Sequence, residues 1–229
     1  IAHGTVTILF MGQSIEATTY RIEKDYTDGR HPDKVEYASK IEEDLSRRDF
    51  TMNAIAASLA DGSIVDPFGG QIDIQQKTIR TVGNPLERFS EDGLRPVRAL
   101  RFAAQLGFEI EPETLKAIPV TNHITKGISI ERFRDEFVKM LKSPKPSVAL
   151  NLMEKTGILK IFLPEFAGCR NVLQKDIRGF HSFDVLDHLI YALDGVILAS
   201  KNQASVELRL ASLFHDIGKP AAKKVEKRP

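Results

Sequence analysis

The chain has 229 residues, 42% hydrophobic and 28% charged, which excludes a disordered or fibrous protein. Its net charge of +1 excludes a global electrostatic field as the basis of nucleic-acid binding, so such binding would need local basic clusters. A single cysteine excludes an internal disulfide framework, and there is no signal-like start or run of about 18 apolar residues. We therefore expect a cytoplasmic protein with no membrane partner; the oligomeric state stays open.

The first part of the chain is expected to contain a small sheet. Residues 5–10 and 15–21 are β-branched and aromatic runs separated by Met-Gly-Gln-Ser, which predicts a hairpin. Segment 24–34 combines glycine, proline, aspartate and charge, which predicts a mobile loop. The apolar spacing of 35–48 indicates a helix, and 61–84 indicates short strands and turns. Because the chain starts on a strand-like run and stops soon after an apolar helix, we expect both ends to lie inside domains.

From about residue 86 the pattern becomes helical. Apolar residues recur at helical spacing in six segments: 90–106, 111–119, 129–142, 145–156, 184–200 and 204–216. The predicted fold class is therefore α+β, with a small β-containing head followed by a helical body.

A polar run lies between the expected helix 35–48 and the apolar stretch that follows it. It contains Arg47, Arg48, Asp49 and Asn53. Arginine forks match phosphate oxygens, a carboxylate accepts hydrogen bonds from sugar hydroxyls, and an amide both donates and accepts. The set suits a nucleoside triphosphate. The alternative is a surface ion-pair network at a helix junction.

A second polar run, residues 90–102, carries Asp92, Arg95, Arg98 and Phe102 at spacings of three and four, which place them on one helical face. Cytosine and adenine both present an amine donor beside a ring-nitrogen acceptor, whereas uracil and guanine present a carbonyl beside an N–H. An aspartate and an arginine that face one cavity can therefore select C and A. The alternative is a simple salt bridge between Asp92 and Arg95.

Three motifs in order, RRDFTMNA, EDGLRPVRALRFA and ERFRDEF (131–137), resemble the signatures of class II tRNA nucleotidyltransferases (CCA-adding enzymes) and bacterial poly(A) polymerases. The resemblance implies a polymerase β-like palm with a mixed sheet, then neck and body helices. It implies transfer of nucleotides from CTP and ATP to the 3′ end of tRNA with two Mg²⁺ ions. The implied domains are a partial palm or head over 1–85, a neck that recognises the base over 86–142 and body helices over 143–180.

The same resemblance assigns roles to individual residues. Ribose and phosphate binding falls to Arg48, Asp49 and Asn53, base reading to Asp92 and Arg95, and a place near the triphosphate to Arg98. Bracing of the neck falls to Glu131, Arg132 and Glu136.

The palm of this family holds Mg²⁺ with three carboxylates. Glu16 matches the third; the alternative is a polar residue on the exposed face of a hairpin. The other two belong to an Asp-x-Asp that we expect upstream of residue 1. We expect this chain by itself to bind nucleotide weakly and not to catalyse, so that the activity belongs to the complete protein. Segment 24–34 matches a mobile element that the family couples to the switch from C to A addition, or it is an ordinary linker.

The C-terminal part, 181–229, resembles the start of an HD-type metal phosphohydrolase domain in HSFDVLDHLIY (181–191) and LRLASLFHDIGK (208–219). The resemblance implies a divalent metal held by His188, His215 and Asp216, with His181 as a ligand or a helix-entry residue. The family pattern needs a further aspartate beyond Lys219. A purely structural His-Asp pair is the alternative.

Three functions remain open. The first is a template-independent RNA nucleotidyltransferase that adds C and A to tRNA, with poly(A), CC-only or A-only addition as variants. The second is an HD-type phosphohydrolase. The third is a non-catalytic RNA-binding protein that uses basic residues of the body helices: Lys139, Lys142, Lys145, Lys155 and Lys160.

Overall fold

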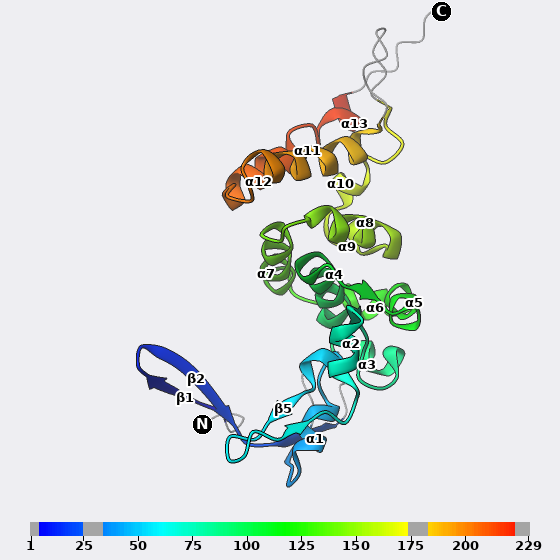
Figure 1. Cartoon of the computed structure of the whole chain (residues 1–229). Helices are drawn as coiled ribbons and strands as arrows, with labels where there is room; N and C mark the ends of the chain where they lie inside the picture. Colours follow the sequence, from blue (N-terminus) through cyan, green and yellow to red (C-terminus); the bar gives the residue numbers. More distant parts are fainter. Residues whose placement is uncertain (1–4, 25–33, 174–182, 223–229) are drawn as a thin grey trace, which may run out of the picture.

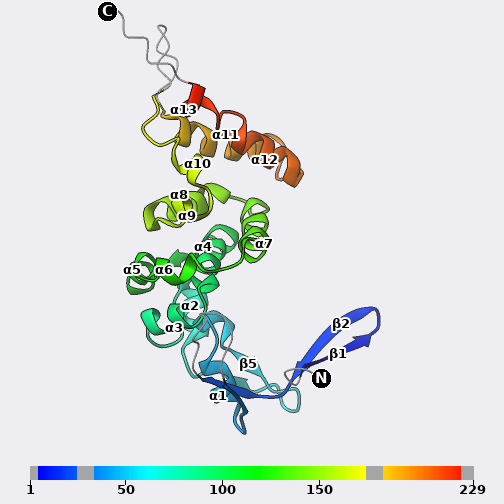
Figure 2. The same ribbon diagram turned by 180° about the vertical axis from the view of Figure 1, so that it is seen from behind.

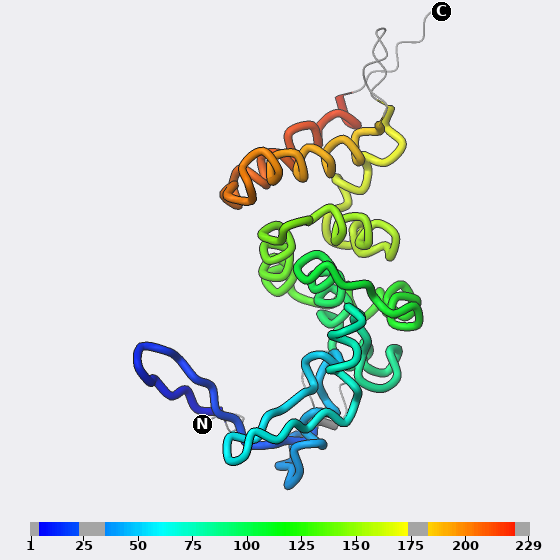
Figure 3. Tube along the Cα trace, viewed as in Figure 1, coloured from blue at the N-terminus to red at the C-terminus, as the bar shows by residue number. Residues whose placement is uncertain are grey.

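The computed structural model describes residues 5–24, 34–173 and 183–222. Figure 1 shows a curved molecule, with the strands and short helices at one end and longer helices stacked toward the other. Figure 2 gives the reverse view, and the trace in Figure 3 follows the same curve from the N-terminal hairpin to the C-terminal helices. The fold is α+β, as the sequence predicts. Among the described residues no helix is both long and apolar enough to span a membrane.

The described strands are short. They are β1 Thr5–Phe10, β2 Gln13–Thr18, β3 Arg21–Lys24, β4 Lys34–Tyr37, β5 Ala56–Ala57, β6 Ile64–Val65, β7 Thr78–Ile79 and β8 Glu109–Ile110. The helices of the N-terminal half are α1 Ile41–Ser46, the 3₁₀ helix η2 Thr51–Asn53, α2 Gly70–Gln75, α3 Pro85–Glu91 and α4 Leu94–Leu106. The later helices are α5 Pro112–Val120, α6 Asn122–Thr125, α7 Ile130–Leu141, α8 Pro146–Thr156, α9 Ile158–Phe162, α10 Pro164–Ala167, α11 Val185–Ala199, α12 Val206–Phe214 and α13 Lys219–Ala222.

The described strands pair only in twos. The pairs β1–β2, β3–β4 and β5–β6 are antiparallel, and β7–β8 is parallel. The single mixed sheet that the family resemblance implies is not formed by these residues. Several of the strands are only two residues long, which leaves little backbone for a further strand to join.

The first two strands form the predicted hairpin. Thr5 faces Thr18 and Phe10 faces Gln13 across the ladder. The turn consists of Met11 and Gly12, both with positive φ, which is the backbone that matches the natural twist of paired strands. Figure 1 shows this hairpin projecting away from the helices.

Three sequence expectations are wrong in detail. Segment 35–48 is not one helix, because residues 34–37 pair with β3 and α1 begins only at Ile41. Segment 61–84 contains the short helix α2 as well as strands. Segment 90–106 is divided into α3 and α4 by Asp92, whose backbone is extended. Most of the predicted loop 24–34, namely 25–33, lies outside the described residues.

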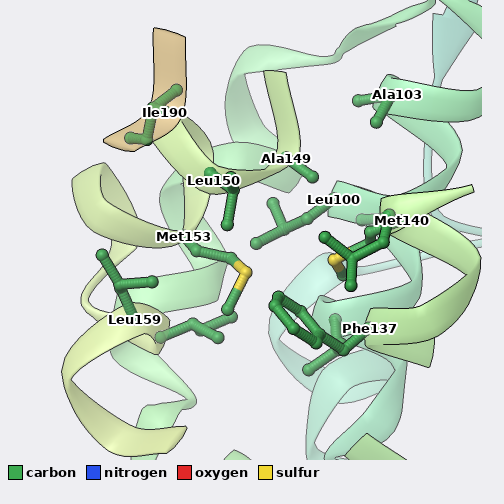
Figure 4. Packing of buried hydrophobic residues seen from close by; sticks show 14 of the residues in the cluster. Leu100, Ala103, Phe137, Met140, Ala149, Leu150, Met153, Leu159 and Ile190 are labelled. Atoms are coloured by element: carbon green, nitrogen blue, oxygen red, sulfur yellow. The ribbon is translucent and has the colours of Figure 1, made fainter. Parts of the chain in front are cut away.

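One continuous hydrophobic core joins the helices of the body. Figure 4 shows side chains of α4, α7, α8, α9 and α11 meeting in this core: Leu100, Ala103, Phe137, Met140, Ala149, Leu150, Met153, Leu159 and Ile190. Truncation of a buried leucine in such a core costs about 2–5 kcal/mol. The core therefore fixes α4, which carries Arg95, Arg98 and Arg101.

A buried arginine joins α12 to the corner between α7 and α8. Arg209 is almost fully buried and donates to the carbonyl oxygens of Leu141 and Ser143, and to Oδ1 of Asn202 at 2.7 Å. Its guanidinium is held by carbonyl and amide oxygens on several sides.

Candidate nucleotide and metal sites

The backbone of the RRDFTMN segment, residues 47–53, is fixed by buried contacts with Thr81 and with α2. Phe50 is fully buried and forms a β-bridge with Thr81. The Thr51 hydroxyl donates to the buried carboxylate of Asp73 at 2.6 Å. At Gly70 in α2, a Cβ would lie 2.2 Å from the Thr51 carbonyl oxygen, so only glycine allows α2 to approach this turn. The polar side chains around the turn therefore start from a fixed backbone.

Asp49 links the first polar run to the second. One carboxylate oxygen accepts from the Asn53 side chain at 3.0 Å and from the Phe50 backbone N–H at 2.9 Å. The other accepts from Nε of Arg98 in α4 at 2.7 Å. The structure thus brings together Asp49, Asn53 and Arg98, although the motifs are about 50 residues apart in the chain.

Arg48 is positioned by an acid that the sequence interpretation missed. Asp44 is buried and accepts from Arg47 at 2.7 Å and from Arg48 at 2.9 Å. Burial acts to raise the pKa of Asp44, but the hydrogen bonds and charges of the two arginines outweigh it and hold the pKa below its ordinary value of 3.8. The spacings of three and four residues from Asp44 to the arginines were a usable signal.

Asp92 and Arg95 do not share a helical face, because Asp92 lies between α3 and α4 and not in a helix. The split occurs at Gly93, where a Cβ would lie 2.8 Å from the carbonyl oxygen of Ile124. The Asp92 carboxylate accepts from the N–H of Leu94, the first residue of α4, at 3.0 Å. The spacing argument was therefore wrong for this pair.

The two proposed base-reading side chains have separate partners. Both oxygens of Asp92 accept from Nη2 of Arg132, at 3.1 and 2.8 Å. Arg95 forms an ion pair with Glu91 and donates to the carbonyl oxygens of Arg88 and Arg47. The alternative of a direct Asp92–Arg95 salt bridge is not found among the ion pairs of the described residues.

Arg95 nevertheless connects the same two motifs as Arg98. Its Nη2 donates to the backbone carbonyl of Arg47 at 3.0 Å, across 48 positions in the chain. Glu91, four residues before Arg95 and three after Arg88, pairs with both arginines. The sequence interpretation missed Glu91, although that spacing is a signal for ion pairs along a helix.

A buried ion pair joins α7 to α4. Glu136 of α7 is buried, pairs with the buried Arg101 of α4 and accepts from Lys139 at 2.8 Å. Arg101 also lies over the Phe102 ring, 3.7 Å from its centroid. Glu131 is exposed. Arg132 therefore joins α7 to the residue between α3 and α4, and Glu136 joins α7 to the middle of α4.

Glu16 lies on the exposed hairpin, in β2 opposite Thr7, and is not brought to the other polar residues. Among the described residues, three side chains of metal-ligand type come close enough together to hold an ion, and Glu16 is not one of them. A lone exposed carboxylate does not hold two Mg²⁺ ions, which need several carboxylates close together. The described residues by themselves therefore do not fit the two-metal site of the palm.

The three side chains that come close enough together to hold a metal ion are those of His188, His215 and Asp216, which were proposed as ligands from the sequence. The Nε2 atoms of the two histidines are 3.0 Å apart, and Oδ2 of Asp216 lies 3.4 and 3.3 Å from them. Nδ1 of His215 lies 2.8 Å from the Ser212 carbonyl oxygen. Since a carbonyl only accepts, Nδ1 carries a proton, and in the neutral ring Nε2 then presents a lone pair to the cluster, as in many metal-bound histidines.

Asp216 is the charged member of the cluster. Burial acts to raise its pKa, but Lys219, at 2.6 Å, and the two histidines lower it below 3.8. The carboxylate is therefore ionised at neutral pH, and two imidazoles with one carboxylate fit a divalent transition metal. His181 lies outside the described residues.

Two family models match the chain. Residues 1–80 match the poly A polymerase head domain. Residues 107–169 match the model described as the probable RNA and SrmB-binding site of polymerase A.

Curated relatives are CCA-adding enzymes. The chain is 47% identical over 176 residues to that of Geobacillus sp. (strain WCH70), a match that covers 77% of this chain and 43% of the relative. It is 47% identical over 174 residues to that of Lactobacillus helveticus (strain DPC 4571), covering 76% and 43%. The chain thus spans less than half the length of these relatives.

Solved structures similar to this chain include CCA-adding and other tRNA nucleotidyltransferases. The Bacillus stearothermophilus CCA-adding enzyme in complex with CTP aligns with a TM-score of 0.66 and 31% identity, over 96% of this chain and 55% of that one. A tRNA nucleotidyltransferase complexed with a primer tRNA and an incoming ATP analog aligns with a TM-score of 0.66 and 28% identity, over 97% and 63%. The chain belongs to the class II CCA-adding enzyme and poly(A) polymerase family and carries its head and RNA-binding domains. Nucleotidyltransferases of this family are typically Mg²⁺-dependent.

Proposed function

We propose that the protein is a template-independent RNA nucleotidyltransferase that adds C and A from CTP and ATP to the 3′ end of tRNA and releases pyrophosphate. The observation that carries the proposal is the junction of the two polar runs. Asp49 pairs with Arg98, and Arg95 donates to the Arg47 carbonyl. The run proposed to bind ribose and phosphates therefore contacts the run proposed to read the base.

The junction offers the groups that a nucleotide requires. The side chains of Arg48 and Arg98 are 46% and 32% exposed, so each uses part of its guanidinium for a carboxylate and leaves the rest accessible to phosphate oxygens. Asp49 and Asn53 lie beside them as partners for the ribose hydroxyls. Asp92 accepts from the base amine and Arg95 donates to the ring nitrogen, once the base joins or displaces their present partners.

Two relatives support CTP and ATP as substrates and tRNA as partner, since they are solved with CTP and with primer tRNA plus an ATP analog. The reaction uses Mg²⁺, and Glu16 is the proposed ligand from this chain. The palm occupies 1–85, the neck 86–142 and the body 143–180. The exposed side chains that follow the RNA backbone lie at the end of the neck and in the body: Lys139, Lys142, Lys145, Lys155 and Lys160.

The test is incorporation from each of the four nucleoside triphosphates, with Mg²⁺, onto tRNA that lacks its terminal CCA. Addition of C, C and then A, with no U or G, supports the proposal. ATP incorporation onto any RNA end indicates a poly(A) polymerase. CC-only or A-only products indicate an enzyme that adds only part of the CCA sequence and needs a second enzyme for the rest. Steeply salt-dependent tRNA binding without any incorporation contradicts the proposal and supports a non-catalytic RNA-binding protein.

A second function, an HD-type metal phosphohydrolase over 181–229, is favoured by the convergence of His188, His215 and Asp216. When bound, a divalent metal would activate water for attack on phosphorus. We expect hydrolysis of a phosphomonoester or a 2′,3′-cyclic phosphate that survives Asp92→Ala and is lost with His215→Ala. Equal loss in both variants, or no hydrolysis with added Mn²⁺ or Mg²⁺, contradicts this second function.

A further inference from the structure

Arg132 makes a two-point contact with Asp92 across 40 positions of the chain. Its Nη2 donates to Oδ1 at 3.1 Å and to Oδ2 at 2.8 Å. The two side chains are about one-fifth exposed, so solvent reaches the contact but does not surround it. The second contact of Asp92, from the Leu94 N–H to Oδ1, fixes one oxygen only. Arg132 is thus the group that orients the plane of this carboxylate.

Helix stability does not explain why an arginine stands at this position. Arg132 is in the first turn of α7, where the helix dipole disfavours a cation. Its Nη1 is buried and has no hydrogen-bond partner among the described residues, whereas a purely structural buried donor is normally satisfied. The buried Arg101–Glu136 pair already joins α7 to α4. Bracing the neck therefore leaves the placement of Arg132 unexplained.

We propose that Arg132 is a positioning residue that determines base specificity by holding the Asp92 carboxylate in the orientation that accepts from an exocyclic amine. This inference rests on the proposed function, because it assumes that Asp92 reads the base. An ionised carboxylate has about four acceptor sites, so Asp92 keeps Arg132 and still accepts from the amine of cytosine or adenine.

The orientation matters most for the bases that are rejected. Uracil and guanine present a carbonyl oxygen where cytosine and adenine present an amine, and that oxygen faces a fixed carboxylate oxygen with no proton between them. Without Arg132, the Asp92 side chain is held at one oxygen and turns aside. The repulsion is then relieved, and U and G are admitted.

The experiment measures kcat/KM for CTP, UTP, ATP and GTP on tRNA lacking CCA, in the complete protein. In Arg132→Gln we expect the CTP/UTP and ATP/GTP ratios to fall roughly 10- to 100-fold, the range for a displaced positioning group. Arg132→Lys, which keeps the charge but not the planar guanidinium, is expected to give ratios between those of Arg132→Gln and the parent protein. The matched control is Arg134→Gln, since Arg134 is on the same helix, is exposed and pairs only with the neighbouring Asp135 among the described ion pairs.

A purely structural role gives a different result: kcat/KM falls by the same factor for all four nucleotides and the ratios stay at the parent value. That outcome overturns the inference. If Arg132→Gln does not fold, judged by its thermal transition, Arg132→Lys supplies the same ratios and decides. Failure of the proposed function is distinguishable, because then neither the parent protein nor Asp92→Ala prefers C and A.

Discussion

Two polar regions of the molecule differ in what surrounds their carboxylates. One is the junction of α1, η2 and α4, and the other is the His188–His215–Asp216 cluster. At the junction the carboxylates are paired with arginines, as Asp49 is with Arg98 and Asp44 is with Arg47 and Arg48. In the C-terminal cluster two imidazole nitrogens and a carboxylate oxygen face one another within 4.8 Å. Excess donors suit a polyanionic ligand, and converging acceptors suit a cation. The comparison therefore predicts an anion-binding site at the first place and a cation-binding site at the second.

The largest effect is expected from Asp92→Ala, which removes the acceptor for the base amine. The preference of the complete protein for CTP over UTP should fall by roughly 100-fold or more, because a buried polar match is lost. Four-nucleotide incorporation kinetics measure it. Glu113→Ala, which removes an exposed carboxylate paired with Lys116 on α5, should leave the preference unchanged. A preserved preference in Asp92→Ala would move base recognition to another residue.

The next effect concerns the opposite site. His215→Ala removes one of three converging ligands and should weaken Mn²⁺ binding by at least about tenfold, measured by titration calorimetry on the chain. The control is His123→Ala, an exposed histidine on α6 whose Nδ1 contacts the Val120 carbonyl. Equal Mn²⁺ affinity in the two variants would show that the cluster is a structural His-Asp contact and would remove one half of the comparison.

Arg98→Ala tests whether the charges of the junction also stabilise the fold. It leaves the buried Asp49 carboxylate without its charged partner, so we expect a loss of roughly 1–3 kcal/mol in the free energy of unfolding. Urea denaturation measures it. Lys116→Ala, which breaks an exposed pair with Glu113, should leave the free energy of unfolding essentially unchanged. Should the two variants lose equal stability, the Asp49–Arg98 contact would not be important for folding.

The smallest effect is a pH dependence from Asp44. Its pKa is lower in the folded chain than its ordinary value of 3.8, because the hydrogen bonds and charges of Arg47 and Arg48 outweigh the effect of burial. The stability it contributes is therefore complete above about pH 4 and is lost as the pH falls through the folded value. Asp44→Asn should flatten the acid limb of a stability-against-pH curve. An unchanged acid limb would mean that Asp44 is not held by the two arginines.

Most of the helical body was predictable from apolar spacing, because α7, α8, α11 and α12 each bury one stripe against a shared core. The secondary-structure predictions fail where contact with a segment distant in the chain determines the local backbone conformation. Lys34–Tyr37 has a helix-compatible pattern but pairs with β3, and the break at Asp92-Gly93 depends on close approach to the Ile124 carbonyl. Local periodicity contains no information on such partners.

The candidate sites were predictable as residue types but not as contacts. The sequence picked out Asp92 and Arg95, yet their spacing suggested one shared face, and the structure gives them Arg132 and Glu91 as partners. The link from Asp92 to Arg132 spans 40 positions and leaves no local signal. The convergence of His188 with His215 and Asp216 was expected, but only from the family resemblance.

The buried guanidinium of Arg209 has a mechanical consequence. Detaching α12 from the corner of α7 and α8 would leave a dehydrated cation and several carbonyl oxygens without partners, including those of Leu141 and Ser143. Helices α11 and α12 and the preceding body therefore form one cooperative unit. Heat should melt them in a single transition, and forces applied at the C-terminal helices should be transmitted to α7.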